Sequence, residues 1–217
     1  MTEQINPGIV FGSETWLNQN IGNKEFLPQG YTAYRKDRKD GYGGTLIAVR
    51  DTFSCQELLT SSSEDDTEIT VVKIEIPKEK PLILVAAYRP PSANLEKSSK
   101  LCDNIESLAQ RHKGSVFWLG GDLNLPDINW ETNSIIGNQN LKSINERFLQ
   151  MIVTIHSEQM VLEPTRNENV LDLFVTNRPS LINRLEVIPG LSDHKAVLIN
   201  SSIKAPRIKP QARKKNT

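Results

Sequence analysis

The chain has 217 residues, of which 37% are hydrophobic, so it is long enough to bury a substantial core in one globular domain. Its 26 basic and 26 acidic residues cancel, which excludes a polycation that holds nucleic acid by bulk attraction; any such binding must come from local patches. No apolar run is long enough to cross a bilayer and the first residues lack a secretory signal, so we expect an intracellular protein with no membrane partner.

Seven apolar runs of strand length follow one another along the chain, separated by turn signals. They cover residues 8–16, 45–51, 69–76, 82–90, 115–122, 171–177 and 194–201. Between the fourth and fifth runs, an approximate helical stripe from Leu95 to Leu108, with Gly114 as a stop, predicts a helix, and residues 141–158 predict a second one. This order predicts an α/β (α+β) domain in which helices cover mixed sheets.

We assign residues 1–203 to this domain. Residues 204–217 are basic and contain two prolines without an apolar period, which is typical of a disordered tail or linker. The basic segment 34–44 is most simply a solvated hairpin turn. Cys55 and Cys102 have no partners at metal-binding spacing and are expected to be reduced.

Polar residues with catalytic chemistry gather at the ends of the predicted strands. Glu14 and Asp122 each follow an apolar run, and together they offer the hard oxygen ligands that a magnesium ion prefers. Asn124 lies two residues after Asp122, so both side chains would point to one face if the strand continued. His194 could take a proton from water or neutralise a phosphoryl oxygen, with Asp172 orienting its ring.

Each of these residues also has a structural interpretation. An acid after a strand is often a turn or capping residue, and the segment Asp122 to Asn124 could form an Asx-turn. Tyr88 could be a half-buried strand end, and Asp193 could cap a loop. His112 and His156 have no acidic motif around them and are expected to be structural. Only the ordered set of residues rises above this background.

That ordered set resembles a known superfamily. The segments SETW, AAYRPP, GGDLN, LDLFVTN and LSDHKAV, in this order over residues 8–200, resemble the endonuclease/exonuclease/phosphatase superfamily. The fuller segments GGDLNLPDINW and EPTRNENVLDLFVTN are most similar to the apurinic-like endonuclease domain of non-LTR (LINE-type) retrotransposons. The resemblance implies a four-layered α/β sandwich, with two mixed sheets face to face and helices outside.

The resemblance also implies a function and a role for each residue. It implies a Mg²⁺-dependent (or Mn²⁺-dependent) phosphodiesterase that nicks DNA, acts in the nucleus, and precedes a reverse transcriptase on a longer polyprotein, which uses the nick as a primer. Glu14, Asp122 and Asp193 would bind metal, and Tyr88 would contact the phosphate. The general base would be either Asp122, oriented by Asn124, or His194.

The chain also departs from this family. Relatives open with a strand that ends in a functional asparagine, followed by a helix, and neither has a counterpart ahead of Glu14. On this basis the domain is amino-terminally truncated, and we expect an exposed sheet edge and an incomplete polar site. Two alternatives to the nicking enzyme therefore stay open: a catalytically impaired remnant that binds nucleic acid, and a repair-type apurinic endonuclease or phosphatase of the same superfamily.

Contacts with DNA phosphates require cations near the site. We expect them from six residues: Arg35, Lys36, Arg38, Lys39, Arg89 and Arg166.

Overall fold

The computed structural model of the chain describes residues 5–38, 41–58, 67–190 and 192–205. No helix in these ranges is long and apolar enough to cross a membrane. The predicted basic tail, apart from its first two residues, and Lys39 lie outside the described residues.

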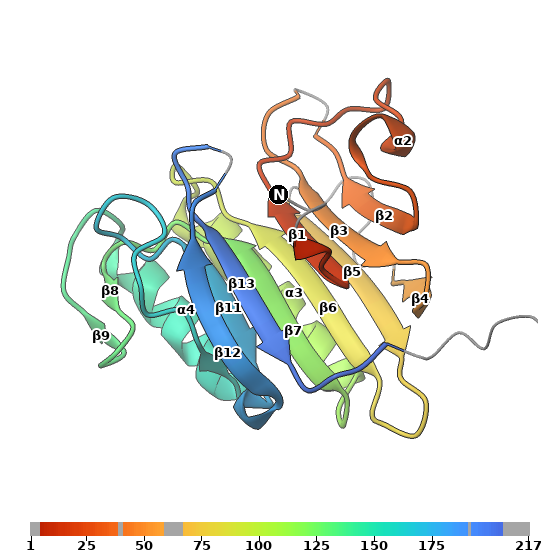
Figure 1. Ribbon diagram of the computed structural model, residues 1–217. Helices are drawn as coiled ribbons and strands as arrows, with labels where there is room; N and C mark the ends of the chain where they lie inside the picture. Colours follow the sequence, from red (N-terminus) through yellow and green to blue (C-terminus); the bar gives the residue numbers. More distant parts are fainter. Residues whose placement is uncertain (1–4, 39–40, 59–66, 191, 206–217) are drawn as a thin grey trace, which may run out of the picture.

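A six-stranded sheet forms the centre of the molecule (Figure 1). Its order is β10 (Glu158–Gln159), β11 (Asp172–Thr176), β7 (Val116–Asp122), β6 (Leu82–Tyr88), β5 (Glu68–Glu75) and β4 (Ser54–Glu57). Only the β6–β7 pair is parallel, and the other neighbours are antiparallel. A parallel pair needs a long crossover, which α3 (Leu95–Arg111) supplies. Residues of β6 are buried throughout because both faces of this strand are covered.

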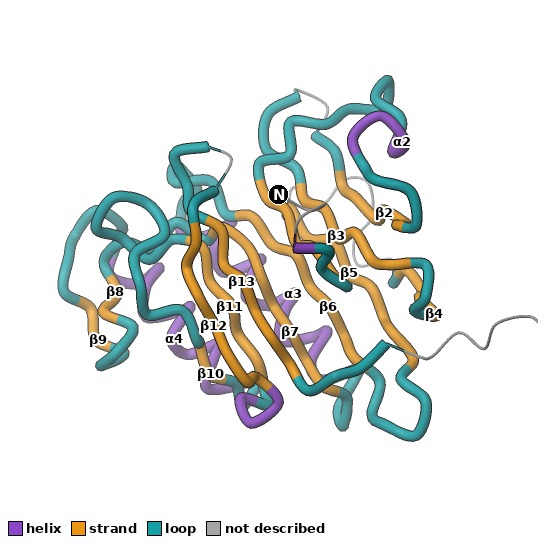
Figure 2. The backbone as a smooth tube through the Cα atoms, in the orientation of Figure 1, coloured by secondary structure: helices purple, strands orange, loops and turns teal. Residues whose placement is uncertain are grey.

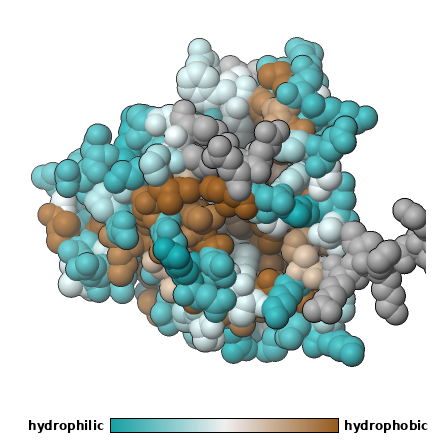
Figure 3. Space-filling model, in the orientation of Figure 1, coloured by the Kyte–Doolittle hydropathy of each residue, from teal (hydrophilic) through white to brown (hydrophobic). Residues whose placement is uncertain are grey.

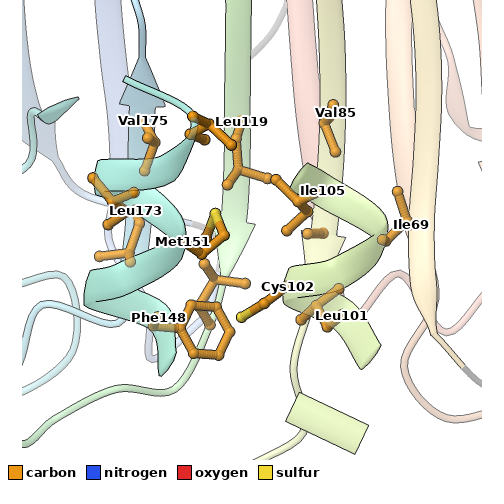
Figure 4. Close-up of a cluster of buried hydrophobic side chains, with 14 of the residues drawn as sticks. Ile69, Val85, Leu101, Cys102, Ile105, Leu119, Phe148, Met151, Leu173 and Val175 are labelled. Atoms are coloured by element: carbon orange, nitrogen blue, oxygen red, sulfur yellow. The ribbon is translucent and has the colours of Figure 1, made fainter. Parts of the chain in front are cut away.

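Two helices, α3 and α4 (Lys142–Thr154), cover one face of this sheet (Figure 2). The side chain of Asn94 accepts a hydrogen bond from the Lys97 amide at 2.9 Å and so caps the start of α3. Apolar residues of both helices meet those of the sheet in a first core (Figure 4). This core includes Cys102, Ile105, Phe148, Met151, Leu119 and Leu173.

Two smaller antiparallel sheets cover the other face. One has the order β1 (Ile9–Ser13), β3 (Thr45–Arg50) and β2 (Tyr31–Lys36), and the other pairs β12 (Ile182–Ile188) with β13 (Ala196–Ser201). A second core lies between these sheets and the six-stranded sheet. It contains Ile47, Val72, Leu84, Trp118 and Phe174, with Phe11 and Val197 packed against it.

The two smaller sheets are not hydrogen-bonded to each other within the described residues. β1 pairs only with β3 there, and β13 pairs only with β12, so each has one open edge, in line with the expected exposed edge. All five residues of β1 are half-buried, whereas five of the six residues of β3 are buried. Hydrophobic side chains reach the surface in the middle of this face of the molecule (Figure 3).

The predicted α+β class, with face-to-face sheets, is confirmed. All seven predicted strands and both long helices are present. In the described residues full-length helices lie only on the outer face of the larger sheet; the remaining α-helix, α2 (Asn23–Phe26), has four residues. Sequence patterns missed six strands: β2, β4, β10, β12, β8 (Ile128–Asn129) and β9 (Ser134–Ile135). These strands are edges or short pairs with many polar residues, so their apolar period is weak.

Candidate active site

Two aspartates lie directly opposite each other where β7 ends and β11 begins. The antiparallel register of these strands pairs Asp122 with Asp172. Asp122 is 3% exposed, while the side chain of Asp172 retains 21% exposure. Directly opposite residues of an antiparallel pair hold their Cβ atoms about 5 Å apart. The strand register therefore concentrates two negative charges in one small volume.

A histidine completes this arrangement. His194 Nδ1 lies 2.7 Å from Asp172 Oδ2, and the side chain of His194 is 17% exposed. The hydrogen bond orients the ring and leaves Nε2 as the nitrogen available to a substrate. Gly190 allows this placement, because a Cβ at that position would lie 1.9 Å from the His194 carbonyl oxygen.

Glu14 and Tyr88 approach from two different layers of the fold. Glu14 follows β1 and has a positive φ of 50°, which turns the chain out of the strand. Tyr88 ends β6, and its hydroxyl donates a hydrogen bond to Glu14 Oε1. One residue earlier, Ser13 Oγ accepts a hydrogen bond from the Asp122 amide at 3.3 Å. These two bonds connect the β1 sheet to the ends of β6 and β7 and bring Glu14 to the site.

Asn124 does not share the face that the strand period predicted. β7 ends at Asp122, and Asn124 has a φ of 48°, which breaks the alternation of an extended strand. Its Nδ2 donates to the Arg89 carbonyl oxygen at 3.0 Å, and its backbone amide donates to Asp122 Oδ1 at 3.1 Å. The prediction that both side chains project together is therefore wrong. Asp122 and Asn124 instead form the Asx-turn that was the alternative.

Burial and neighbouring acids control the protonation of the site. Burial raises the pKa of Asp122 to about 7, with Asp172 adding to the rise, whereas His194 and the Asn124 amide lower the pKa and Glu14 adds a further smaller rise. Burial also raises the pKa of the Tyr88 phenol well above its usual range, and its hydrogen bond with Glu14 adds to this rise. Tyr88 is therefore a neutral donor at physiological pH.

The excess of negative charge suits a divalent cation. The charges of Asp172 and Glu14 each raise the pKa of Asp122, and His194 is the compensating group that lowers it. Magnesium commonly binds through one or two carboxylates and keeps several waters. Within the described ranges, no three acids, histidines or cysteines form a cluster that could hold a metal, so the predicted three-ligand set of Glu14, Asp122 and Asp193 is not assembled. Glu14 keeps one carboxylate oxygen, Oε2, that no hydrogen bond reaches within the described residues, as a metal ligand requires.

Asp193 lies beside the site but has another partner. Its carboxylate is 2.6 Å from Arg166 Nη2, and both side chains are largely exposed. Arg166 sits in a tight hairpin whose Thr165 is fully buried. Thr165 Oγ1 accepts hydrogen bonds from the amides of Leu171 and Asp172, at 3.1 and 3.0 Å. In the sequence Thr165 stands only within the motif EPTRNENVLDLFVTN, and its place six and seven residues before the two donors gives no local signal.

The predicted phosphate contacts divide into three groups. Arg89 is 1% exposed and cannot reach DNA, so that prediction is wrong. Arg35 donates to the carbonyl oxygens of Asn18 and Ile21, and Lys36 donates to that of Thr67, so both side chains already serve the fold. Two further predicted cations, Arg38 and Arg166, keep 37% and 42% exposure in ion pairs with acids.

Comparisons with known proteins agree with this architecture. A family model described as endonuclease-reverse transcriptase matches residues 82–198. Among solved structures, the endonuclease domain of TRAS1, a telomere-specific non-LTR retrotransposon, is 16% identical with a TM-score of 0.70, over 93% of this chain and 88% of that one. An AP endonuclease from Archaeoglobus fulgidus is 13% identical with a TM-score of 0.68, over 93% and 91% of the two chains.

Truncated Caenorhabditis elegans TDP2 is also similar, with 15% identity and a TM-score of 0.56, over 90% of this chain and 84% of that one. No curated protein matches the sequence. At these identities the structural matches show a shared fold.

Proposed function

Because the chain belongs to the endonuclease-reverse transcriptase family, we propose that it is a divalent-metal-dependent endonuclease that nicks DNA. The observation that carries the proposal is the pairing of Asp122 with Asp172 across β7 and β11, with His194 hydrogen-bonded to Asp172. An acid and an oriented histidine at one point are suited to hydrolysing a phosphodiester by in-line attack.

Each residue has a role that its position supports. Asp122 hydrogen-bonds the attacking water and accepts its proton, and the Asn124 amide fixes the carboxylate for this task. Once protonated, His194 donates from Nε2–H to a phosphoryl oxygen, since Nδ1–H is engaged with Asp172. Tyr88 donates to Glu14 and holds this carboxylate in place. As the water oxygen bonds to phosphorus, the bond from phosphorus to the leaving oxygen breaks, and the leaving oxygen takes a proton from solvent water.

Glu14 is the residue that would hold the metal. A bound Mg²⁺ or Mn²⁺ would neutralise charge on the phosphoryl oxygens and orient the substrate. Tyr88 donates to Oε1 of Glu14, and within the described residues no hydrogen bond reaches Oε2, the oxygen that would bind the metal.

The biological setting is the finer part of the proposal. The similar TRAS1 domain comes from a non-LTR retrotransposon, and the family name couples an endonuclease to a reverse transcriptase. We propose that the nick made by this domain primes reverse transcription at a target site in the nucleus, by a reverse transcriptase on the same polyprotein.

A plasmid-nicking assay tests the activity. Supercoiled plasmid is incubated with the wild-type protein in Mg²⁺, in Mn²⁺ and in EDTA, and the fraction of open-circular plasmid is measured over time. We expect metal-dependent nicking that Asp122→Ala and His194→Ala each reduce by at least about 100-fold. Asp103→Asn, which changes an exposed acid on α3, is the matched control and should keep full activity. Nicking that persists in both active-site variants, or none by the wild type in either metal, would refute the proposal.

A further inference from the structure

The side chain of Arg89 is the largest among those that are almost completely buried, yet no carboxylate accepts its hydrogen bonds within the described residues. Burying a cation without an ion-pair partner is unfavourable, because its solvation by water is lost. Burial accordingly lowers the pKa of this guanidinium. The charges of Asp122 and Asp127 oppose this shift, and the hydrogen bonds of Arg89 must offset the rest of the cost of burial.

The guanidinium of Arg89 joins three segments of the chain by hydrogen bonds. Nε donates to Ser98 Oγ in the first turn of α3 at 2.9 Å. Nη1 donates to the carbonyl oxygen of Asn124, two residues after Asp122, at 3.0 Å. Nη2 donates to the Ala93 carbonyl oxygen at 3.0 Å and to Asn140 Oδ1, ahead of α4, at 2.9 Å.

The backbone of Arg89 holds the same loop from the other side. Its amide donates to the Asp122 carbonyl oxygen, and its carbonyl oxygen accepts from Asn124 Nδ2, both at 3.0 Å. Asn140 Nδ2 donates to the Asn124 carbonyl oxygen at 3.2 Å, so that oxygen has two donors. The turn from Asp122 to Asn124 is thus fixed at both ends by one residue.

The loop ahead of α4 is itself anchored, which makes Asn140 a firm support. Asp127 is 1% exposed, and its carboxylate accepts from the amides of Gln139 and Asn140, at 2.9 and 2.6 Å, and from Asn145 Nδ2 at 3.2 Å. Hydrogen bonds to a charged carboxylate are stronger than those between neutral groups. The support therefore runs from Asp127 through Asn140 to Arg89 and the Asp122 turn.

We propose that Arg89 is a positioning residue for the proposed nuclease: its guanidinium, with Asn140, holds the turn that points Asp122 at the scissile phosphate. This inference rests on the proposed function for its catalytic consequence, but its structural claim concerns the turn alone. Lysine would keep the charge and lose the planar fork that reaches all three segments, so Arg89→Lys is not a conservative change here.

Two measurements on the whole chain test the inference. Amide hydrogen exchange at Asn124, followed by NMR in EDTA, reports the turn without any activity. Arg89→Lys should speed this exchange by about 10-fold, and Asn140→Ala, which leaves Arg89 in place and sits on a partly exposed residue, should speed it by a smaller factor in the same direction. Nicking kinetics should show kcat falling by about 100-fold for Arg89→Lys, with KM for DNA within about threefold of the wild type.

Arg147→Gln is the control for a purely structural loss. Arg147 joins α3 and α4 through Glu106 and Asp103, at 2.7 and 2.6 Å, and lies outside the network of the Asp122 turn. It should lower the melting temperature without changing exchange at Asn124 or the kcat of the folded protein. If Arg89→Lys does not fold, Asn140→Ala carries the test.

The outcomes separate the two claims. Unchanged exchange at Asn124 in Arg89→Lys or, failing that, in Asn140→Ala overturns the positioning role. Faster exchange with an unchanged kcat in an active enzyme overturns it as well. If Arg89→Lys or Asn140→Ala speeds exchange but the wild-type protein nicks no DNA, the claim about the turn is supported and only the proposed function is refuted.

Discussion

Replacing Asp122 by asparagine should stabilise the metal-free protein at alkaline pH. The carboxylate is 3% exposed and faces Asp172 across the strand pair, and its pKa rises from 3.8 to about 7. The folded state therefore holds the proton more tightly than the unfolded chain. The stability from this group is fully present below about pH 4 and is lost as the pH rises through about 7. Asparagine cannot ionise and keeps an oxygen that accepts from the Asn124 amide.

The size of the effect follows from the pKa. A rise of about three in pKa corresponds to about 4 kcal/mol, at about 1.4 kcal/mol for each unit. Electrostatic coupling of Asp122 to Asp172 and His194 reduces this energy. We therefore expect Asp122→Asn to raise the free energy of unfolding by about 2 to 4 kcal/mol at pH 8. The gain should shrink to about 0.5 kcal/mol near pH 4, where the folded carboxyl is protonated and the unfolded one is about half protonated.

Urea unfolding in EDTA at several pH values between 4 and 8 measures this difference. Asp193→Asn is the matched control, because that carboxylate is 64% exposed and is paired with Arg166. Its free energy of unfolding should change by about 0.5 kcal/mol or less, without a rise toward pH 8. Equal stabilities of the wild type and Asp122→Asn at pH 8, or a gain that is the same at pH 4 and pH 8, would show that the fold does not raise the pKa of Asp122.

Three further predictions concern neighbouring positions. Asp172→Asn should lower kcat for nicking by at least about 100-fold with little change in KM, because it releases the His194 ring; a normal kcat in the plasmid assay would contradict this. Gly121→Ala should lower the free energy of unfolding in urea by about 3 kcal/mol or more, since the φ of Gly121 is 142° and a Cβ would lie 1.9 Å from a β6 carbonyl oxygen. The control Gly114→Ala, with open space around its Cβ, should lower it by about 1 to 2 kcal/mol, and equal losses would rule out this close approach. Arg166→Gln should raise KM for DNA by about threefold and weaken its salt dependence by about one charge; an unchanged salt dependence would remove Arg166 from the DNA contact.

The strand-end residues show how far a linear pattern reaches. Apolar runs predicted the strands that carry Glu14, Tyr88, Asp122 and Asp172, because buried strands leave a strong hydrophobic signal. The prediction that the side chains of Asp122 and Asn124 point to the same face failed for a local reason. Alternation holds only while the backbone stays extended, and the left-handed φ of Asn124 ends it after one residue.

Arg89 shows the opposite limit. In sequence it is a cation beside prolines at a strand end, which favours a surface contact, yet the structure buries it completely. Its partners come from α3, from the loop before α4 and from the turn after β7, up to 51 residues away. A cation among backbone carbonyls has no compensating acid nearby in the chain, so no local charge pattern marks it as internal.

The sequence by itself determined the order of the seven most apolar strands and the two long helices, and the polar residues at the strand ends, since these depend on burial along single elements. Tertiary structure alone decided which of those residues meet. The register of β7 against β11 places Asp122 opposite Asp172, and the packing of β1 over β6 and β7 brings Glu14 to Tyr88. Such contacts depend on pairing between distant strands, where a shift of one residue would turn every side chain to the other face.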